Sequence, residues 1–152
     1  MKIHAVAASF ATFCLALSLT AAPQNKGNYL AQKLVDDTHT KHPEAVEIGI
    51  ATVGSGGCKT IASTDKKDIG EKCEKEDSEP IRTGKPYVET EGKNFDVTLP
   101  LHDSSGKIVG SVGLELTPKP GESQDAVVEQ AQSIAKEMEA AIPTKASLTQ
   151  SF

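Results

Sequence analysis

The sequence predicts an α+β domain in which a five-stranded antiparallel sheet is flanked by a long N-terminal helix and a C-terminal helix. Three observations lead to this fold class. Residues 95–116 alternate apolar and polar side chains around a short polar turn, which is typical of a β-hairpin. Residues 46–53 are rich in Ile and Val, as strands are. Residues 28–42 and 127–142 carry apolar side chains at helical spacing.

The hairpin at residues 95–116 divides its side chains between two faces. A turn at residues 103–106 that pairs His102 with Lys107 is the favoured register, because a one-residue slip would scramble both faces. One face is then almost wholly apolar: Phe95, Val97, Leu99, Leu101, Ile108, Gly110, Val112 and Leu114. The other face is mixed: Asp96, Thr98, Pro100, His102, Lys107, Val109, Ser111, Gly113 and Glu115. We expect the apolar face to seat the N-terminal helix and the mixed face to carry any specificity.

The remaining strands complete the sheet. The first strand turns back through a Gly-rich loop into a second strand at residues 58–63. Residues 64–83 are polar, with charges of alternating sign, which predicts a solvated crossing segment with a short helix near residues 75–81. Residues 86–90 are expected to form a third strand before the hairpin.

The N-terminus has the layout of a secretory signal peptide. Lys2 precedes an apolar run at residues 5–19, which is shorter than the about 20 apolar residues of a membrane-spanning helix. The signal peptide is expected at residues 1–22, with cleavage after Ala21 or Ala22. Retention of this segment as a membrane anchor is the alternative. The mature chain is expected to be periplasmic or secreted.

The rest of the chain has room for one domain. Residues 23–143 are expected to form it, and residues 144–152 are expected to be a tail. No second apolar segment follows the first, so the mature chain should have no membrane span. The lysines are dispersed and the net charge is -5, which argues against a nucleic-acid partner.

Two cysteines, Cys58 and Cys73, remain once the signal peptide with Cys14 is removed. In an oxidising compartment this even pair is expected to form a disulfide, which would stabilise the fold by roughly 3 kcal/mol on the chain-entropy model. The sequence has no CxxC redox spacing, no CxxCH haem site and no four-ligand zinc pattern.

Three phrases of the sequence resemble the single-Cache domain, an extracytoplasmic sensor family with a PAS-like fold. They are IASTDKKDIGEKC at residues 61–73, IRTGKPYVE at residues 81–89 and DVTLPLHDSSGKIVGSVGLEL at residues 96–116, and the likeness covers roughly residues 28–116. The resemblance implies that a small molecule, often a carboxylate, amine or amino acid, lies between the sheet and the crossing segment. Family members usually drive an output module across a membrane, and the sequence shows neither a second membrane helix nor such a module. A free binding protein, or one that presents its ligand to a membrane receptor or sensor protein, is therefore expected.

The candidate ligand-binding residues are Arg82, Tyr87 and four residues of the mixed hairpin face. Arg82 is the only arginine, and a guanidinium holds a carboxylate through two parallel hydrogen bonds; a surface pair with Glu79 or Asp77 is the alternative. Tyr87 combines a ring with a polar tip, although it could equally pack in the core. The residues on the mixed face are Asp96, Thr98, Ser111 and Glu115. By resemblance, Glu115 falls near the position that binds the ligand amine in amino-acid-binding relatives, with a solvent-facing carboxylate as the alternative.

No catalytic motif is visible, since the sequence lacks a nucleophile elbow, an HExxH motif and a spaced carboxylate pair. His39 and His42 are interpreted as helix-end residues rather than metal ligands. The sequence therefore predicts no enzyme, no cofactor and no metal. The leading hypothesis is an exported Cache-like module that binds a small polar metabolite, such as a carboxylate or amino acid, without transforming it. The alternative is a structural or protein-interaction module of the same fold without a ligand pocket.

Overall fold

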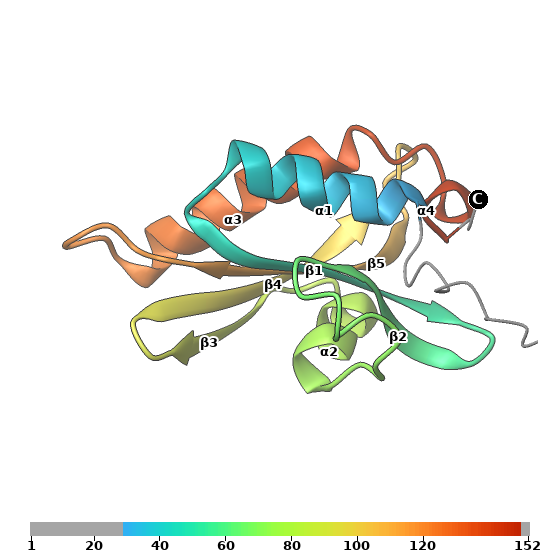
Figure 1. The fold of residues 1–152 in the computed structure, drawn as a ribbon, viewed down its shortest axis with the longest axis horizontal. Coiled ribbons are helices and arrows are strands. Elements are labelled where there is room, and N and C mark those ends of the chain that lie inside the picture. The colour runs from blue at the N-terminus through green and yellow to red at the C-terminus, as the bar shows by residue number, and fades with distance from the viewer. Residues whose placement is uncertain (1–28, 150–152) are drawn as a thin grey trace, which may run out of the picture.

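The computed structural model describes residues 29–149 as one α+β domain built on a five-stranded antiparallel sheet (Figure 1). The elements are, in chain order, α1 (Tyr29–Lys41), β1 (Ala45–Gly54), β2 (Gly57–Ser63), α2 (Lys75–Thr83), β3 (Tyr87–Glu91), β4 (Asn94–His102), β5 (Ile108–Leu116), α3 (Gln124–Glu139) and α4 (Lys145–Thr149). The strand order is β2-β1-β5-β4-β3. The predicted fold class is confirmed.

Helices α1 and α3 cover one face of the sheet, and α2 lies on the other face (Figure 1). Helix α1 packs on β1 and β2, whereas α3 packs on β4 and β5, and the two helices touch. The predicted apolar face therefore seats both helices rather than α1 alone. The stripe that α3 buries consists of Val127, Ala131, Ile134, Ala135 and Met138. The strand residues beneath the helices include Ile48, Ile50, Val97, Leu99, Leu101, Val112, Leu114 and Leu116.

The register of the β4–β5 hairpin differs from the predicted one by two residues. Leu101 lies opposite Gly110, and an irregularity follows before His102 meets Ile108. The turn is wider than expected because the Asp103 side chain accepts hydrogen bonds from the backbone of Ser105 and Lys107. A shift of two residues keeps the side chains of residues 95–101 and 110–116 on their faces, because side chains alternate with a period of two. The predicted division into an apolar and a mixed face is retained for those residues. Beyond the irregularity it is not, since His102, predicted on the mixed face, contacts Glu139 of α3, and Val109, also predicted there, belongs to the core.

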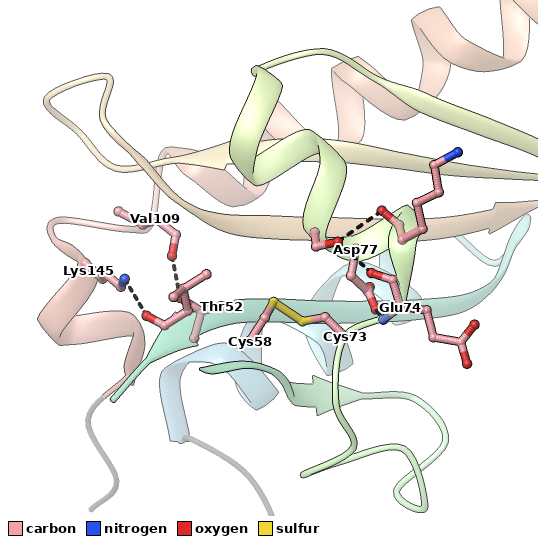
Figure 2. The surroundings of a disulfide bond; sticks show 10 residues. Thr52, Cys58, Cys73, Glu74, Asp77, Val109 and Lys145 are labelled. Carbon is pink, nitrogen blue, oxygen red and sulfur yellow. Dashed lines mark hydrogen bonds between the residues drawn. A yellow bond between two sulfur atoms is a disulfide. The ribbon is translucent and has the colours of Figure 1, made fainter. Parts of the chain in front are cut away.

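The segment predicted to be a tail contains the short helix α4. Leu148 in this helix is 0% exposed and belongs to the core, and α4 packs against α1. The Lys145 Nζ donates a hydrogen bond to the Val53 carbonyl at 2.7 Å (Figure 2). The prediction failed here because five residues carry too little periodicity to indicate a helix.

Cys58 and Cys73, the predicted pair, form a disulfide that joins the start of β2 to the segment before α2 (Figure 2). The Cys73 backbone N–H also donates to the Cys58 carbonyl at 3.2 Å. Across residues 29–149 we find no helix with the length and apolarity that a membrane crossing requires. The signal peptide expected at residues 1–22 lies outside the described residues.

Candidate functional site

A polar cavity of about 240 Å³ lies between the mixed face of the sheet and α2 with the crossing segment before it. The sheet supplies the floor of this cavity, in two neighbouring cross-strand rows. The crossing segment and the first turn of α2 supply the roof, through Asp68, Glu71, Lys72, Glu74, Glu76 and Asp77.

The first row of the floor consists of acidic residues from four adjacent strands, and we name it the acid row: Glu47, Glu115, Asp96 and Glu89. Glu47 is the direct partner of Glu115, Glu115 of Asp96, and Asp96 of Glu89. Directly opposed residues of antiparallel strands project from the same face of a sheet, so all four carboxylates project on the α2 side. The first three of them line the cavity.

The second row of the floor is small and polar: Ser63, Gly49, Gly113 and Thr98 are consecutive cross-strand partners. The two glycines leave open the space that side chains would fill. A Cβ on Gly113 would lie 3.6 Å from the Thr98 Oγ1. Thr98 is only 2% exposed and lines the cavity, and its hydroxyl has no hydrogen-bond partner among residues 29–149.

The roof is attached to the edge strand β2 by several bonds. The Thr60 N–H donates to the Glu71 carbonyl at 3.0 Å, and the Gly70 N–H donates to the Thr60 carbonyl at 2.9 Å. The Ser63 hydroxyl donates to the Asp68 carboxylate at 3.1 Å. Together with the disulfide, these bonds hold the crossing segment over the floor.

Burial and neighbouring carboxylates raise several pKa values in the cavity. The pKa of Asp96 rises to about 6, mainly through burial and then through the charges of Glu76 and Glu91. Burial also raises the pKa of Glu47, to which Asp68 and Glu115 contribute. Ionisation of Asp96 and Glu47 is therefore less favourable in the cavity than in water.

Three of the predicted site residues, Asp96, Thr98 and Glu115, come together in the cavity. The Glu115 carboxylate accepts a hydrogen bond from the Asn94 side-chain amide at 2.6 Å. Ser111 points to the same face of β5 as Glu115 but does not line the cavity. It is 1% exposed, and its hydroxyl has no hydrogen-bond partner within the described part of the chain.

Arg82 and Tyr87 lie outside the cavity. Arg82 is in the last turn of α2, its side chain is 73% exposed, and its guanidinium lies 3.6 Å from the Glu79 carboxylate. This surface pair is the alternative that the sequence left open. The Tyr87 hydroxyl donates to the Glu89 carboxylate at 2.6 Å, and the ammonium of Lys75 lies 5.5 Å from the centre of the Tyr87 ring.

The two histidines at the end of α1 have protein partners. The His39 Nδ1 lies 2.9 Å from the Ala45 carbonyl oxygen. His42 lies between the carboxylates of Glu44 and Glu137, at 3.4 and 3.2 Å. Within residues 29–149, no group of three His, Cys, Asp or Glu side chains is placed to hold a metal ion.

Glu47, the two glycines of the floor and the acidic residues of the roof were not among the residues predicted from the sequence. Glu47 carried a detectable signal, since it is an acidic residue inside an Ile- and Val-rich strand. The roof carboxylates carried none, because the same alternating charges suit a solvated loop.

No protein-family model and no curated protein matches the chain. Solved structures do match it. The GAF domain of a phosphoenolpyruvate-protein phosphotransferase from Acinetobacter is 10% identical over 73% of this chain and 78% of that one, with a TM-score of 0.50. The GAF domain of a two-component sensor histidine kinase from Bacillus halodurans is 12% identical over 72% of this chain and 91% of that one, also at 0.50. The reduced form of fRMsr from Staphylococcus aureus is 9% identical over 76% of this chain and 84% of that one, at 0.51.

At these identities the likeness shows the fold alone, which is the GAF/PAS-like fold of sensor domains. The predicted PAS-like architecture is confirmed at this level, and the fold is compatible with a sensory ligand-binding module. The neighbours do not single out the Cache family within it.

The prediction that the chain is not an enzyme, which was made from the absence of catalytic motifs, is wrong. The matching protein fRMsr is a methionine-R-sulfoxide reductase, so this fold also occurs in enzymes. The absence of familiar motifs from the sequence consequently excludes no catalytic activity, because an active site is built on a fold from a few residues that the fold does not specify.

Proposed function

We propose that this chain is a sensory module that binds a small polar molecule in the cavity between α2 and the sheet. The cavity itself, with Thr98, a residue that is only 2% exposed, in its wall, is the observation that supports this proposal. A hydroxyl that faces a cavity and has no protein partner is free to form a hydrogen bond with a bound ligand or water. The volume of about 240 Å³ is below the range of about 300–1,000 Å³ typical of drug-sized ligands, which favours a small metabolite.

We further propose that the module works outside the cytoplasm and belongs to the Cache branch of the fold. The disulfide supports export, because disulfides persist in oxidising compartments, and so does the signal peptide expected at residues 1–22. The three Cache-like phrases support the family. Such a module would report its ligand to a membrane receptor or a sensor protein.

A structural or protein-interaction module without a pocket is the alternative function. It would require the mixed face of the sheet to be filled by side chains, as a core is. The open cavity favours ligand binding over this alternative.

Native mass spectrometry of the full chain purified from its source tests the proposal, together with a thermal-shift screen against organic acids, amino acids, amines and purines. Gly113→Val should fill the cavity and abolish both a retained molecule and the thermal shift. The matched control is Gly54→Val, because a Cβ on Gly54 meets no atom within 4 Å and Gly54 lies outside the cavity. The proposal fails if no small molecule stabilises the wild-type chain while a macromolecular partner does.

A further inference from the structure

The charge around the cavity is strongly one-sided. Nine of its lining residues are acidic and one, Lys72, is basic. Among residues 29–149, none of these nine carboxylates forms an ion pair with Lys, Arg or His. Acidic residues elsewhere are paired, as Asp36 is with Lys66 and Glu137 is with Lys41. Lysines therefore pair with acidic residues elsewhere in the described chain, whereas the acidic residues of the cavity have no ion-pair partner.

Part of this acidity has a structural explanation in the roof. The Asp77 carboxylate accepts a hydrogen bond from the Glu74 backbone N–H at 3.2 Å and so helps to cap α2. Acidic residues in a first helical turn also interact favourably with the helix dipole, which amounts to roughly half a positive charge. That partial charge is too small to neutralise Glu74, Glu76 and Asp77 and the floor as well.

The acid row of the floor has no such explanation. Like charges directly opposite each other on antiparallel strands destabilise a sheet, and here three such pairs follow one another across four strands. Asp96, in the middle of the row, has neither a hydrogen bond to its carboxylate nor an ion pair within the described residues. A cation bound against Asp96 would remove this repulsion.

The Thr98 hydroxyl gives an independent indication of what binds. Asp96 and Thr98 are two residues apart on β4, so both project into the cavity from neighbouring rows. Thr98 is 2% exposed and lines the cavity, and its hydroxyl has no partner in residues 29–149 and can accept a hydrogen bond from an N–H group. An ammonium supplies both the positive charge for Asp96 and the donor for Thr98.

A metal ion fits the same residues less well. Calcium takes six to eight oxygen ligands, roughly 2.3–2.6 Å away, from several convergent groups. In the described part of the chain no three acidic, His or Cys side chains converge in that way.

We propose that the ligand of the cavity is a small organic cation with at least one ammonium group, held by the acid row and by the Thr98 hydroxyl. This inference rests on the proposed function, since it names the class of molecule that the cavity binds. It also replaces the carboxylate that Arg82 was expected to hold.

Calorimetric titration of the full chain with ligands of equal length and different charge tests the inference. The central set has four carbons: butane-1,4-diamine, butane-1,4-diol and butanedioate. Diamines, diols and dicarboxylates of three to six carbons extend it, and Ca²⁺ is included as the inorganic alternative. We expect at least one diamine to bind at least tenfold more tightly than its diol, with no heat from its dicarboxylate.

The outcomes separate the two proposals. Equal or tighter binding of a diol, a dicarboxylate or Ca²⁺ overturns the organic cation and leaves a binding function in place. Binding by no member of any series overturns both the inference and the proposed function.

Single substitutions test whether Asp96 and Thr98 bind the cation. Asp96→Asn removes one charge of the acid row and should weaken diamine binding at least tenfold, and Thr98→Val, which keeps the shape and removes the hydroxyl, should weaken it severalfold. Glu129→Gln removes an exposed charge from α3, on the other side of the sheet, and should change affinity less than twofold. Equal effects of Asp96→Asn and Glu129→Gln would show that only net charge matters, which overturns the assignment to the acid row. Thermal unfolding of each variant confirms that it is folded.

Discussion

Asp96 is a half-buried carboxylate whose ionisation opposes folding. Its pKa rises from an ordinary 3.8 to about 6 in the folded chain, first through burial and then through Glu76 and Glu91. Between those two values the folded state binds more protons than the unfolded state. The free energy of unfolding therefore decreases as pH rises from about 4 to about 6.

Asp96→Asn should consequently stabilise the protein at pH 7 and have little effect at pH 4. One pKa unit corresponds to about 1.4 kcal/mol, and solvent screening reduces the gain to about 1–2 kcal/mol. Urea denaturation of both proteins at the two pH values measures it. A variant that is less stable than the wild type at pH 7 contradicts the assignment, as does a gain that does not depend on pH. A substitution that raises stability and weakens ligand binding is what a binding site built at the expense of stability predicts.

Gly110 is required by a close approach of two backbones. A Cβ at this position would lie 2.3 Å from the Ala51 carbonyl oxygen, which no rotamer change can relieve. Gly110→Ala should therefore cost about 1–3 kcal/mol of unfolding free energy. Gly49→Ala is the matched control, because its Cβ would have no atom closer than 4.0 Å. Equal losses in thermal unfolding would show that the cost reflects strand glycine replacement in general.

The cavity-lining residues that could be predicted from the sequence are those whose position depends only on strand alternation. Asp96, Thr98 and Glu115 were found because every second residue of a strand shares a face, and the two-residue register error did not change that face. Arg82 was expected beside the cavity and does not line it, because it lies on a helix, where orientation depends on how α2 packs on the sheet. Cross-strand pairing of Glu47 with Glu115 could not be predicted either, since it brings together residues far apart in the chain.

At the scale of elements, the disulfide is the covalent link between the roof of the cavity and the sheet (Figure 2). Cys58 and Cys73 are 15 residues apart, and a loop of that length implies about 3 kcal/mol of stabilisation on the chain-entropy model. Cys58→Ser combined with Cys73→Ser should lower the free energy of unfolding by about that amount, and with it the melting temperature. It should also weaken ligand binding, because the roof is then held by hydrogen bonds alone. A reducing agent should reproduce both effects in the wild type and neither in the double variant. Unchanged affinity after reduction would show that the roof does not need the disulfide.

Helix α4 is too short for the spacing of apolar residues in the sequence to predict it. Its length is five residues, and its contribution depends on Leu148 reaching the core beside α1. The longer helices could be predicted because α1 and α3 repeat their apolar positions over three or more turns.

Removal of α4 should therefore destabilise the domain. Leu148→Ala deletes a fully buried side chain and should cost about 2–4 kcal/mol, measured by chemical denaturation. Thr149→Ala, at an exposed position of the same helix, should cost less than about 0.5 kcal/mol. Equal stability of the two variants would restore the interpretation of this segment as a tail.

At the scale of the whole molecule, two groups of carboxylates make the free energy of unfolding change with pH in opposite directions. Raised pKa values occur at Glu47, Asp77 and Asp96. Lowered pKa values occur at Glu44, Asp103 and Glu137. The first group stabilises the fold at low pH and loses that contribution as pH rises through the folded pKa values. The second group stabilises it at higher pH and loses that contribution as pH falls.

The free energy of unfolding should thus pass through a maximum on the acid side of neutrality, at about pH 5. Denaturation at intervals from pH 3 to pH 8 measures this profile. A saturating cationic ligand should reduce the loss of unfolding free energy above this pH. The cation offsets the negative charges that the carboxylates with raised pKa values acquire on ionisation. A maximum at or above pH 7 without ligand would contradict the dominance of the cavity carboxylates.

The two faces of the sheet also determine how this chain can diverge. Residues that hold the fold and residues that line the cavity alternate along the same strands, so neighbours in sequence are under unrelated constraints. Substitutions at Asp96, Thr98 or Glu115 can change ligand preference without disturbing Val97 or Leu114 in the core. Homologous chains should accordingly vary at every second position of β4 and β5 and keep the positions between, so that new specificities arise on an inherited core.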